Sequence, residues 1–139
     1  MSSGQHGSHR GGSRVAPYVF GIQTLPLVAS GVYTLLWPAA AAGLPNSPLQ
    51  GLSNGTIQAL SLTSLSLGSF YAIAACQNNT PMMMAAIPGR LLAMVVFYRS
   101  GGGWKNVAPF EGLMGLFTAF GLYWDWYTAR PAEEEEKQE

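Results

Sequence analysis

The sequence predicts an all-α integral membrane protein, a four-helix bundle with a disordered tail at each end, and three observations support this prediction. Only 10% of the residues are charged, far below the roughly 25% of soluble domains. No Asp, Glu, Lys or Arg occurs between Arg14 and Arg90, and a soluble domain would struggle to keep such a surface wet. Four apolar segments long enough to cross a bilayer are separated by turn-forming residues.

The two ends of the chain have compositions that do not support folding. Residues 1–16 begin with a Gly- and Ser-rich segment that has no apolar residue from Ser2 to Arg14. Such a segment cannot bury enough surface to fold alone. Residues 128–139 end in the acidic sequence EEEEKQE, and a block of like charges stays solvated. The membrane domain is therefore expected to cover residues 17–127.

The first predicted span covers residues 17–37, which form a helix about 31 Å long and so match the hydrocarbon core. Pro26 should kink this helix, because proline removes one backbone hydrogen bond and crowds the preceding turn. Four polar side chains in this span are expected to make interhelical hydrogen bonds rather than to bind a substrate. They are Gln23, Thr24, Ser30 and Thr34.

The second predicted span covers residues 57–76 and follows a Pro-rich connection, part of which is expected to lie along the membrane surface. A small residue recurs at every fourth position of this span, which allows another helix to approach closely. These positions are Ser64, Gly68, Ala72 and Cys76.

The third predicted span covers residues 81–98 and begins after a tight turn, so it should be an antiparallel neighbour of the second. Ala85, Gly89 and Ala93 form a stripe of small residues that would match the stripe of the second span. Pro88 followed by Gly89 predicts a break or kink in the middle of this helix.

The fourth predicted span covers residues 107–127 and carries Glu111 in its first turn. It ends in an aromatic belt, YWDWY, that places Asp125 at the membrane interface. An even number of spans puts both tails on one side. The positive-inside rule then favours cytoplasmic tails, without indicating the organelle, because Arg10, Arg14, Arg130 and Lys137 would lie on the tail side and Arg99 and Lys105 opposite.

Arg90 and Glu111 are the ionisable residues that lie inside apolar segments, and they determine where any chemistry would occur. A charge costs roughly 2.5 to 3.5 kcal/mol to place at the centre of a membrane helix on insertion scales. The two spans run antiparallel, so the long Arg90 side chain can reach the depth of Glu111. We therefore predict that the two residues form an ion pair or share a polar pocket.

Two interpretations of this pair are open. In the first, the pair only fastens two helices together. In the second, it forms a catalytic site in which Arg90 holds an anionic or carbonyl group and Glu111 acts as acid or base. Asp125 is a further catalytic candidate, although an Asp flanked by Trp124 and Trp126 at an interface is in most cases solvated.

The usual signatures of membrane enzymes and metal sites are absent from the sequence. It has no His cluster, HExxH, GxSxG or DDxxD pattern. The only cysteine, Cys76, excludes an internal disulfide and a CxxC site. We therefore expect no cofactor and no metal. The net charge of zero and the lack of a basic, aromatic patch indicate no nucleic-acid partner.

The third and fourth spans resemble those of small four-helix DoxX-like integral membrane proteins. The resemblance lies in an Arg within one span, Arg90, a short Gly-bearing loop, and a following span that opens with EGLMG at residues 111–115. It implies a four-helix membrane bundle. Because members of that family are largely of unknown function, it implies no particular activity.

Two functions follow from these observations. The first is a non-enzymatic multi-pass protein that packs lipid or a small apolar ligand, or that is a subunit beside a membrane-protein partner or a second copy of itself. The second is a small membrane enzyme of the isomerase or cyclase type that acts on a lipophilic or terpenoid substrate, with Glu111 as acid or base and Arg90 as anion holder.

Overall fold

The computed structural model describes residues 14–136, and from residue 130 onward only the backbone. The parts of the predicted tails at residues 1–13 and 137–139 lie outside the described residues. All regular elements in the described part of the chain are α-helices. They are α1 (Val15–Ile22), α2 (Thr24–Leu36), α3 (Pro38–Gly43), α4 (Asn54–Cys76), α5 (Thr80–Ser100) and α6 (Trp104–Glu136).

Three helical stretches of the described chain are long and apolar enough to cross a membrane, Val15–Leu36, Asn54–Cys76 and Thr80–Ser100. They correspond to the first three predicted spans. Large apolar side chains on these helices are exposed, as expected for surfaces that face lipid; Leu92, for example, is 65% exposed. The fourth predicted span, residues 107–127, is the central part of α6, and its insertion into a membrane stays a prediction.

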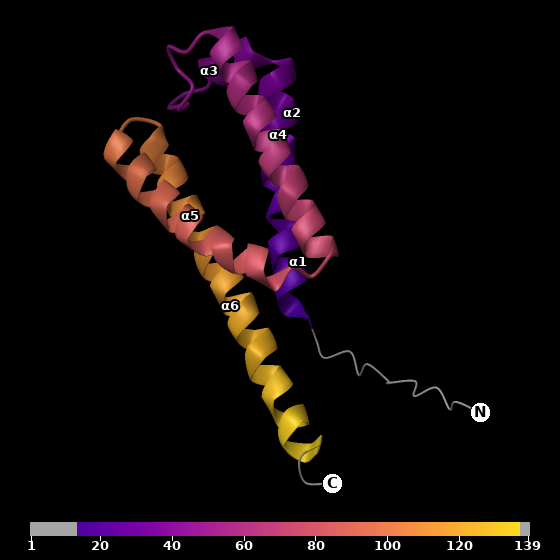
Figure 1. Cartoon of the computed structure of the whole chain (residues 1–139). Helices are drawn as coiled ribbons and strands as arrows, with labels where there is room; N and C mark the ends of the chain where they lie inside the picture. The colour runs from indigo at the N-terminus through magenta and orange to yellow at the C-terminus, as the bar shows by residue number, and fades with distance from the viewer. Residues whose placement is uncertain (1–13, 137–139) are drawn as a thin grey trace, which may run out of the picture.

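The four long helical segments form two pairs that diverge. Helix α2 packs along α4, and α5 packs along α6. Figure 1 shows these pairs as the two arms of a V, and α1 packs against both α6 and α4 where the arms meet. The two pairs contact each other little away from this junction, so the arrangement differs from a closed bundle.

The pairing of the second and third predicted spans differs from the prediction. Helices α4 and α5 share a tight turn, but their stripes of small residues do not pack together. A Cβ atom added to Gly68 would lie 2.8 Å from Val28 Cγ2, so Gly68, in the stripe of α4, faces α2 instead. A Cβ atom added to Gly89 would meet nothing within 4 Å. Stripes of small residues allow close approach without specifying which helix approaches.

The two prolines inside predicted spans have different effects. The first span breaks at Gln23, between α1 and α2, because Pro26 has no N–H to bond to the carbonyl of Ile22 and its ring crowds that carbonyl. The predicted kink is therefore confirmed. Helix α5 continues through Pro88 without a break, and Figure 1 shows it curving along its length.

The connection after the first span and the end of the last span are more helical than predicted. Helix α3 occupies the first part of the Pro-rich connection, and α4 begins at a Ser53 cap, whose hydroxyl accepts a hydrogen bond from the Thr56 N–H at 3.2 Å. Helix α6 extends from the predicted end at residue 127 to Glu136. Ala and Glu favour helix, and extending an existing helix adds one hydrogen bond for each residue fixed.

Candidate functional site

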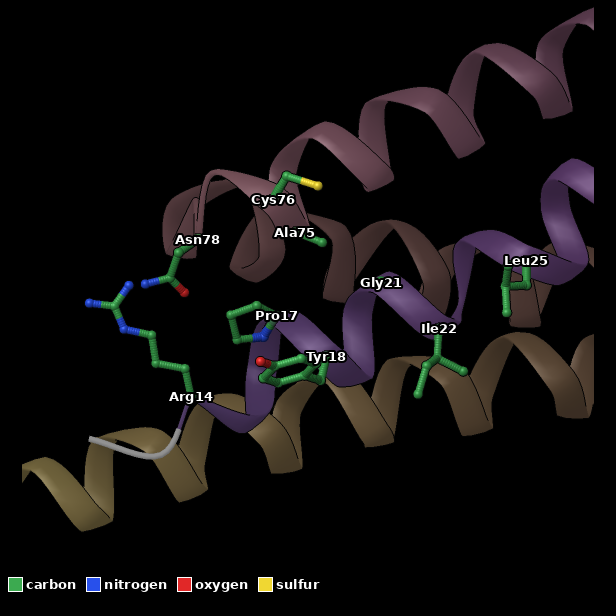
Figure 2. Close-up of a pocket in the computed structure, with 9 residues that line it drawn as sticks. All are labelled: Arg14, Pro17, Tyr18, Gly21, Ile22, Leu25, Ala75, Cys76 and Asn78. Atoms are coloured by element: carbon green, nitrogen blue, oxygen red, sulfur yellow. The ribbon is translucent and has the colours of Figure 1, made fainter. Parts of the chain in front are cut away.

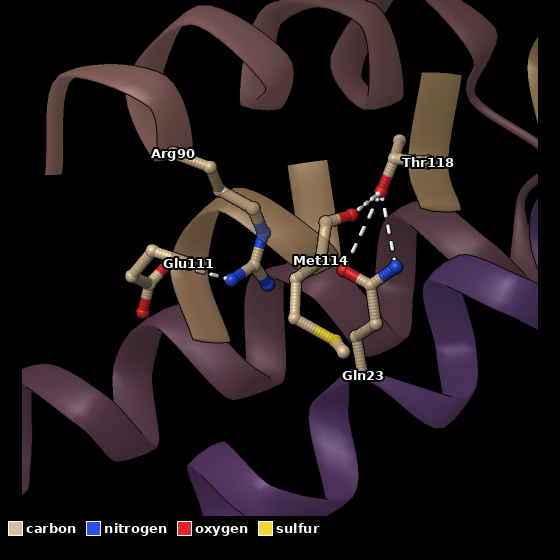
Figure 3. Close-up of polar contacts among 5 residues, drawn as sticks. All are labelled: Gln23, Arg90, Glu111, Met114 and Thr118. Carbon is tan, nitrogen blue, oxygen red and sulfur yellow. Dashed lines mark hydrogen bonds and ion pairs between the residues drawn. The ribbon is translucent and has the colours of Figure 1, made fainter. Parts of the chain in front are cut away.

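Arg90 and Glu111 form the ion pair that the sequence predicts. Arg90 on α5 donates a hydrogen bond from Nη1 to Oε2 of Glu111 on α6 at 2.8 Å (Figure 3). Helix α5 packs along α6, which allows the long Arg90 side chain to reach Glu111. Arg90 is only 4% exposed and Glu111 is 15% exposed, so the arginine is the sealed member of the pair and the carboxylate is the accessible one.

The rest of the Arg90 guanidinium lies against an aromatic ring rather than against hydrogen-bond acceptors of the described residues. Its Cζ atom lies 5.2 Å from the centre of the Tyr71 ring on α4, which permits a cation–π contact. Tyr71 packs in turn against Phe20 of α1, with ring centres 4.6 Å apart. The Nε and Nη2 atoms of Arg90 have no hydrogen-bond partner in the described part of the chain. Glu111 is therefore the principal counter-charge of Arg90.

A second buried polar contact lies close to this pair. Gln23, at the break between α1 and α2, donates from Nε2 to Oγ1 of Thr118 on α6 at 3.0 Å. Thr118 donates to the carbonyl of Met114 one turn earlier at 2.9 Å (Figure 3). The break that Pro26 causes thus occurs where Gln23 joins the first span to α6, and the predicted interhelical role of Gln23 is confirmed.

Of the other three polar residues predicted to form hydrogen bonds between helices, one does so and two do not. Thr34 shares a hydrogen bond of 2.7 Å with Ser61 of α4, as expected. Thr24 and Ser30 bond instead to carbonyl groups of their own segment, those of Gly21 and Leu27. A hydroxyl inside an apolar helix can satisfy itself locally, so its presence does not by itself indicate an interhelical contact.

A cleft of about 600 Å³ lies between the two helix pairs. Most of its wall is apolar, and Glu111 is its ionisable group. Oε2 of Glu111 is bound to Arg90, whereas Oε1 makes no hydrogen bond with a described residue and points away from Arg90 in Figure 3. Arg90 does not line the cleft. The α2 and α4 side includes Leu27, Ser30, Leu60 and Ser64, and the α5 and α6 side includes Phe97, Trp104 and Phe110.

The loops close one end of the cleft. The backbone of Gly103, in the turn before α6, lies so close to the backbone from Asn46 to Pro48 that a Cβ atom there would collide with it. Phe97 and Trp104 stack with ring centres 4.8 Å apart in the neighbouring wall. Pro48 also lines the cleft, so the Pro-rich connection covers its loop end.

Asp125 has a structural role at the other end of α6. Its Oδ1 accepts a hydrogen bond from the Val15 N–H at 2.6 Å, and its Oδ2 accepts one from the Ala16 N–H at 2.9 Å. These are the first two residues of α1, whose own N-cap residue, Arg14, provides no side-chain cap. A carboxylate at a helix N-terminus satisfies free N–H groups and favours the helix dipole. Asp125 is thus engaged rather than freely solvated, and it lies about 21 Å along α6 from Glu111.

The sequence interpretation missed two contributors to the site. One is Tyr71, which lies beneath the guanidinium of Arg90. The other is the segment around Pro48 that covers the cleft. An aromatic hydroxyl inside a predicted span, away from the expected aromatic belt, was the available signal for Tyr71. No local pattern indicates that a connection folds back over a cleft.

No family model matches the chain, and no curated protein or solved structure matches it. The resemblance to DoxX-like proteins therefore stays a prediction. No group of three or more His, Cys, Asp or Glu side chains that could hold a metal ion occurs in the described part of the chain. The function has to be argued from the cleft and its polar groups.

Proposed function

We propose that this chain is a non-enzymatic multi-pass membrane protein that holds a lipophilic molecule in the cleft between its two helix pairs. The observation that carries the proposal is the cleft itself, which has a volume of about 600 Å³ and one ionisable side chain in its wall. Small-molecule sites occupy roughly 300 to 1,000 Å³ and combine apolar walls with few polar groups. A cleft between apolar helices is also accessible to molecules that partition into the bilayer.

The polar groups of the cleft favour a ligand that donates a hydrogen bond. Glu111 offers the oxygen that Arg90 does not use, and this oxygen can only accept while the carboxylate is ionised. Ser30 and Ser64 add hydroxyl groups to the wall. Glu111 lines the cleft and Arg90 does not. The negative charge of the Glu111 carboxylate therefore disfavours a ligand with an anionic head group. The expected ligand is an apolar molecule with a hydroxyl or amine head.

Filling the cleft tests the proposal. Ser64 lines the cleft, whereas Ser66, two residues further along α4, is exposed and does not line it. The native chain, Ser64→Phe and Ser66→Phe are purified in mild detergent, and their bound molecules are extracted and identified by mass spectrometry. We expect the native chain and Ser66→Phe to retain the same apolar compound and Ser64→Phe to lose most of it. Equal retention in all three would contradict ligand binding in the cleft.

The position of Glu111 also supports a second candidate, a membrane isomerase or cyclase. A general acid or base must lie within hydrogen-bond reach of its substrate, and Glu111 reaches the cleft. In this alternative Arg90 would act through Glu111, by holding its carboxylate in place. We would compare lipid-soluble extracts of cells that contain equal amounts of the native chain and Glu111→Gln. A pair of compounds of which one accumulates and the other vanishes supports the enzyme, and matching extracts support the non-enzymatic proposal.

We place α6 as a fourth span and both tails on the cytoplasmic side. Residues 107–127 have the length of a span, and the charge distribution supports this orientation. Arg14 and Arg130 would then lie on the cytoplasmic face, with Arg99 and Lys105 on the other. The bilayer is the principal partner in this proposal, and the DoxX-like resemblance agrees with the four-span arrangement.

A further inference from the structure

A second cavity lies where α1 begins and α4 ends, and it shares no lining residue with the cleft. Its volume is about 520 Å³. Figure 2 shows the Arg14 guanidinium, the Asn78 amide and the Tyr18 hydroxyl at one end, while Ile22 and Leu25 lie at the other. We call this cavity the interface groove. Its two ends differ in chemistry, as the two ends of a lipid do.

The polar end of the interface groove carries the positive charge of Arg14. Arg14 has no ion pair with the side chains that the structure describes. The nearby acid on α6, Asp125, already accepts hydrogen bonds from Val15 and Ala16 with its two oxygens. The side chains of Tyr18 and Asn78 make no hydrogen bond with another described residue. Arg14, Tyr18 and Asn78 therefore offer donors to an external acceptor.

The depth of the groove matches one leaflet of a bilayer. Arg14 immediately precedes the apolar stretch Val15–Leu36, and Asn78 lies in the turn between the stretches Asn54–Cys76 and Thr80–Ser100. The polar end thus lies at the membrane surface. Leu25 is about 16 Å further along the helix axis, which is half of the roughly 30 Å hydrocarbon core. The groove runs from headgroup level towards the middle of the membrane.

We propose that the interface groove binds one anionic phospholipid of the adjacent leaflet. The phosphate accepts hydrogen bonds from Arg14, Asn78 and Tyr18, and an acyl chain lies along Ile22 and Leu25. Guanidinium groups bind phosphate oxygens in pairs. A zwitterionic headgroup carries its own cation beside the phosphate, so an anionic headgroup gains more from Arg14. Free phosphate would leave the apolar part of the groove uncovered, which favours a lipid.

The test measures which lipids stay bound. The full chain is placed in nanodiscs of dioleoyl phosphatidylcholine that contain a minor fraction of dioleoyl phosphatidylglycerol, and retained lipids are counted by native mass spectrometry. We expect phosphatidylglycerol to be enriched on the native chain. Arg14→Gln should lower this enrichment about fivefold, the effect of one cation at a membrane surface, and Arg14→Lys should retain most of it.

The matched control is Lys105→Gln, which removes the same charge near the other ends of the long helices, where Lys105 lies 5.6 Å from the Tyr98 ring. We expect this variant to keep the native enrichment, and the cleft variant Ser64→Phe to keep it too. Arg14 is exposed, so Arg14→Gln should melt at the native temperature in the same nanodiscs. Native enrichment in Arg14→Gln, or an equal loss in Lys105→Gln, would overturn the proposal.

Discussion

Arg90 is a buried cation, and Glu111 is its one oppositely charged hydrogen-bond partner among the described residues. Removing Glu111 should therefore change the free energy of unfolding by a measurable amount. Removing one member of a buried pair leaves an uncompensated charge and costs roughly 3 to 5 kcal/mol, whereas replacing both with apolar residues is often neutral. Because Glu111 is 15% exposed, water offsets part of that cost. We expect Glu111→Leu to lower the free energy of unfolding by about 2 to 3 kcal/mol.

The double variant Arg90→Met with Glu111→Leu distinguishes a charge effect from a packing effect. We expect it to be more stable than Glu111→Leu alone, because no charge is left buried. Detergent-induced unfolding monitored by circular dichroism, with all variants in the same micelle, gives the comparison. If the double variant loses as much stability as Arg90→Met and Glu111→Leu lose together when each is measured singly, the pair matters for packing and not for charge.

Asp125 on α6 accepts hydrogen bonds from two backbone N–H groups of α1. Its contribution to stability can therefore be measured at those two amides. Asp125→Ala leaves the N–H groups of Val15 and Ala16 without their acceptor. We expect a loss of about 1 to 2 kcal/mol in the free energy of unfolding and faster hydrogen exchange at these two amides. Asp125→Asn retains one acceptor oxygen and should give an intermediate exchange rate. Unchanged exchange at both amides in Asp125→Ala would exclude the capping role.

At the scale of a helix, the packing of α4 on α2 depends on Gly68. A Cβ atom there would approach Val28 Cγ2 to 2.8 Å, whereas one at Gly89 on α5 meets open space. We expect Gly68→Leu to destabilise the chain by roughly 1 to 3 kcal/mol, because overpacking forces the helices apart. Gly89→Leu should be neutral or slightly stabilising, since Leu favours helix over Gly.

Detergent-induced unfolding of the two glycine variants tests the helix pairing directly, because each variant adds the same side chain to a different long helix. Equal effects of Gly68→Leu and Gly89→Leu would contradict the packing of α4 on α2. A larger effect at Gly89 would support the alternative pairing of α4 with α5.

The helices themselves and the pairing of α5 with α6 could be predicted from the sequence, whereas the pairing of α4 with α2 could not. The charge-free stretch and the prolines define the first three spans, and the lone charges Arg90 and Glu111 predict their own contact because neither has another partner inside the apolar segments. Stripes of small residues occur on both the second and the third predicted spans, and they do not identify a partner. The cap that Asp125 provides for α1 could not be predicted either, because its donors are backbone N–H groups, which no pattern of residue types indicates.

The cleft is a property of the whole molecule and follows from the divergence of the two helix pairs. No single helix contains it, and its wall combines residues from α2, α4, α5 and α6 with Pro48 of the connection. The ion pair lies on the α5 and α6 side, and the contact between Gln23 and Thr118 links that side to the first span. The contact between Gln23 and Thr118 joins the two arms close to their junction, and the cleft lies between the arms.

The number of membrane spans decides whether both helix pairs lie in the bilayer. Three spans would put residues 14 and 129 on opposite sides of the membrane, whereas a fourth span in α6 puts them on the same side. In a Cys76→Ala background, single cysteines replace Asn78, Ala129 and Gln50, and a membrane-impermeant thiol reagent is applied to sealed vesicles. We expect Asn78→Cys and Ala129→Cys to share one accessibility and Gln50→Cys to have the other.

We expect this labelling pattern because Asp125 contacts Val15 and Ala16 and so holds the end of the α6 apolar segment beside the start of the first predicted span. If α6 is a span, residues beyond Asp125 leave the membrane on the side of Asn78, which lines the interface groove with Arg14. If Ala129→Cys is labelled together with Gln50→Cys, α6 does not cross the membrane. Glu111 would then lie outside the bilayer, and the cleft would open to water rather than to lipid.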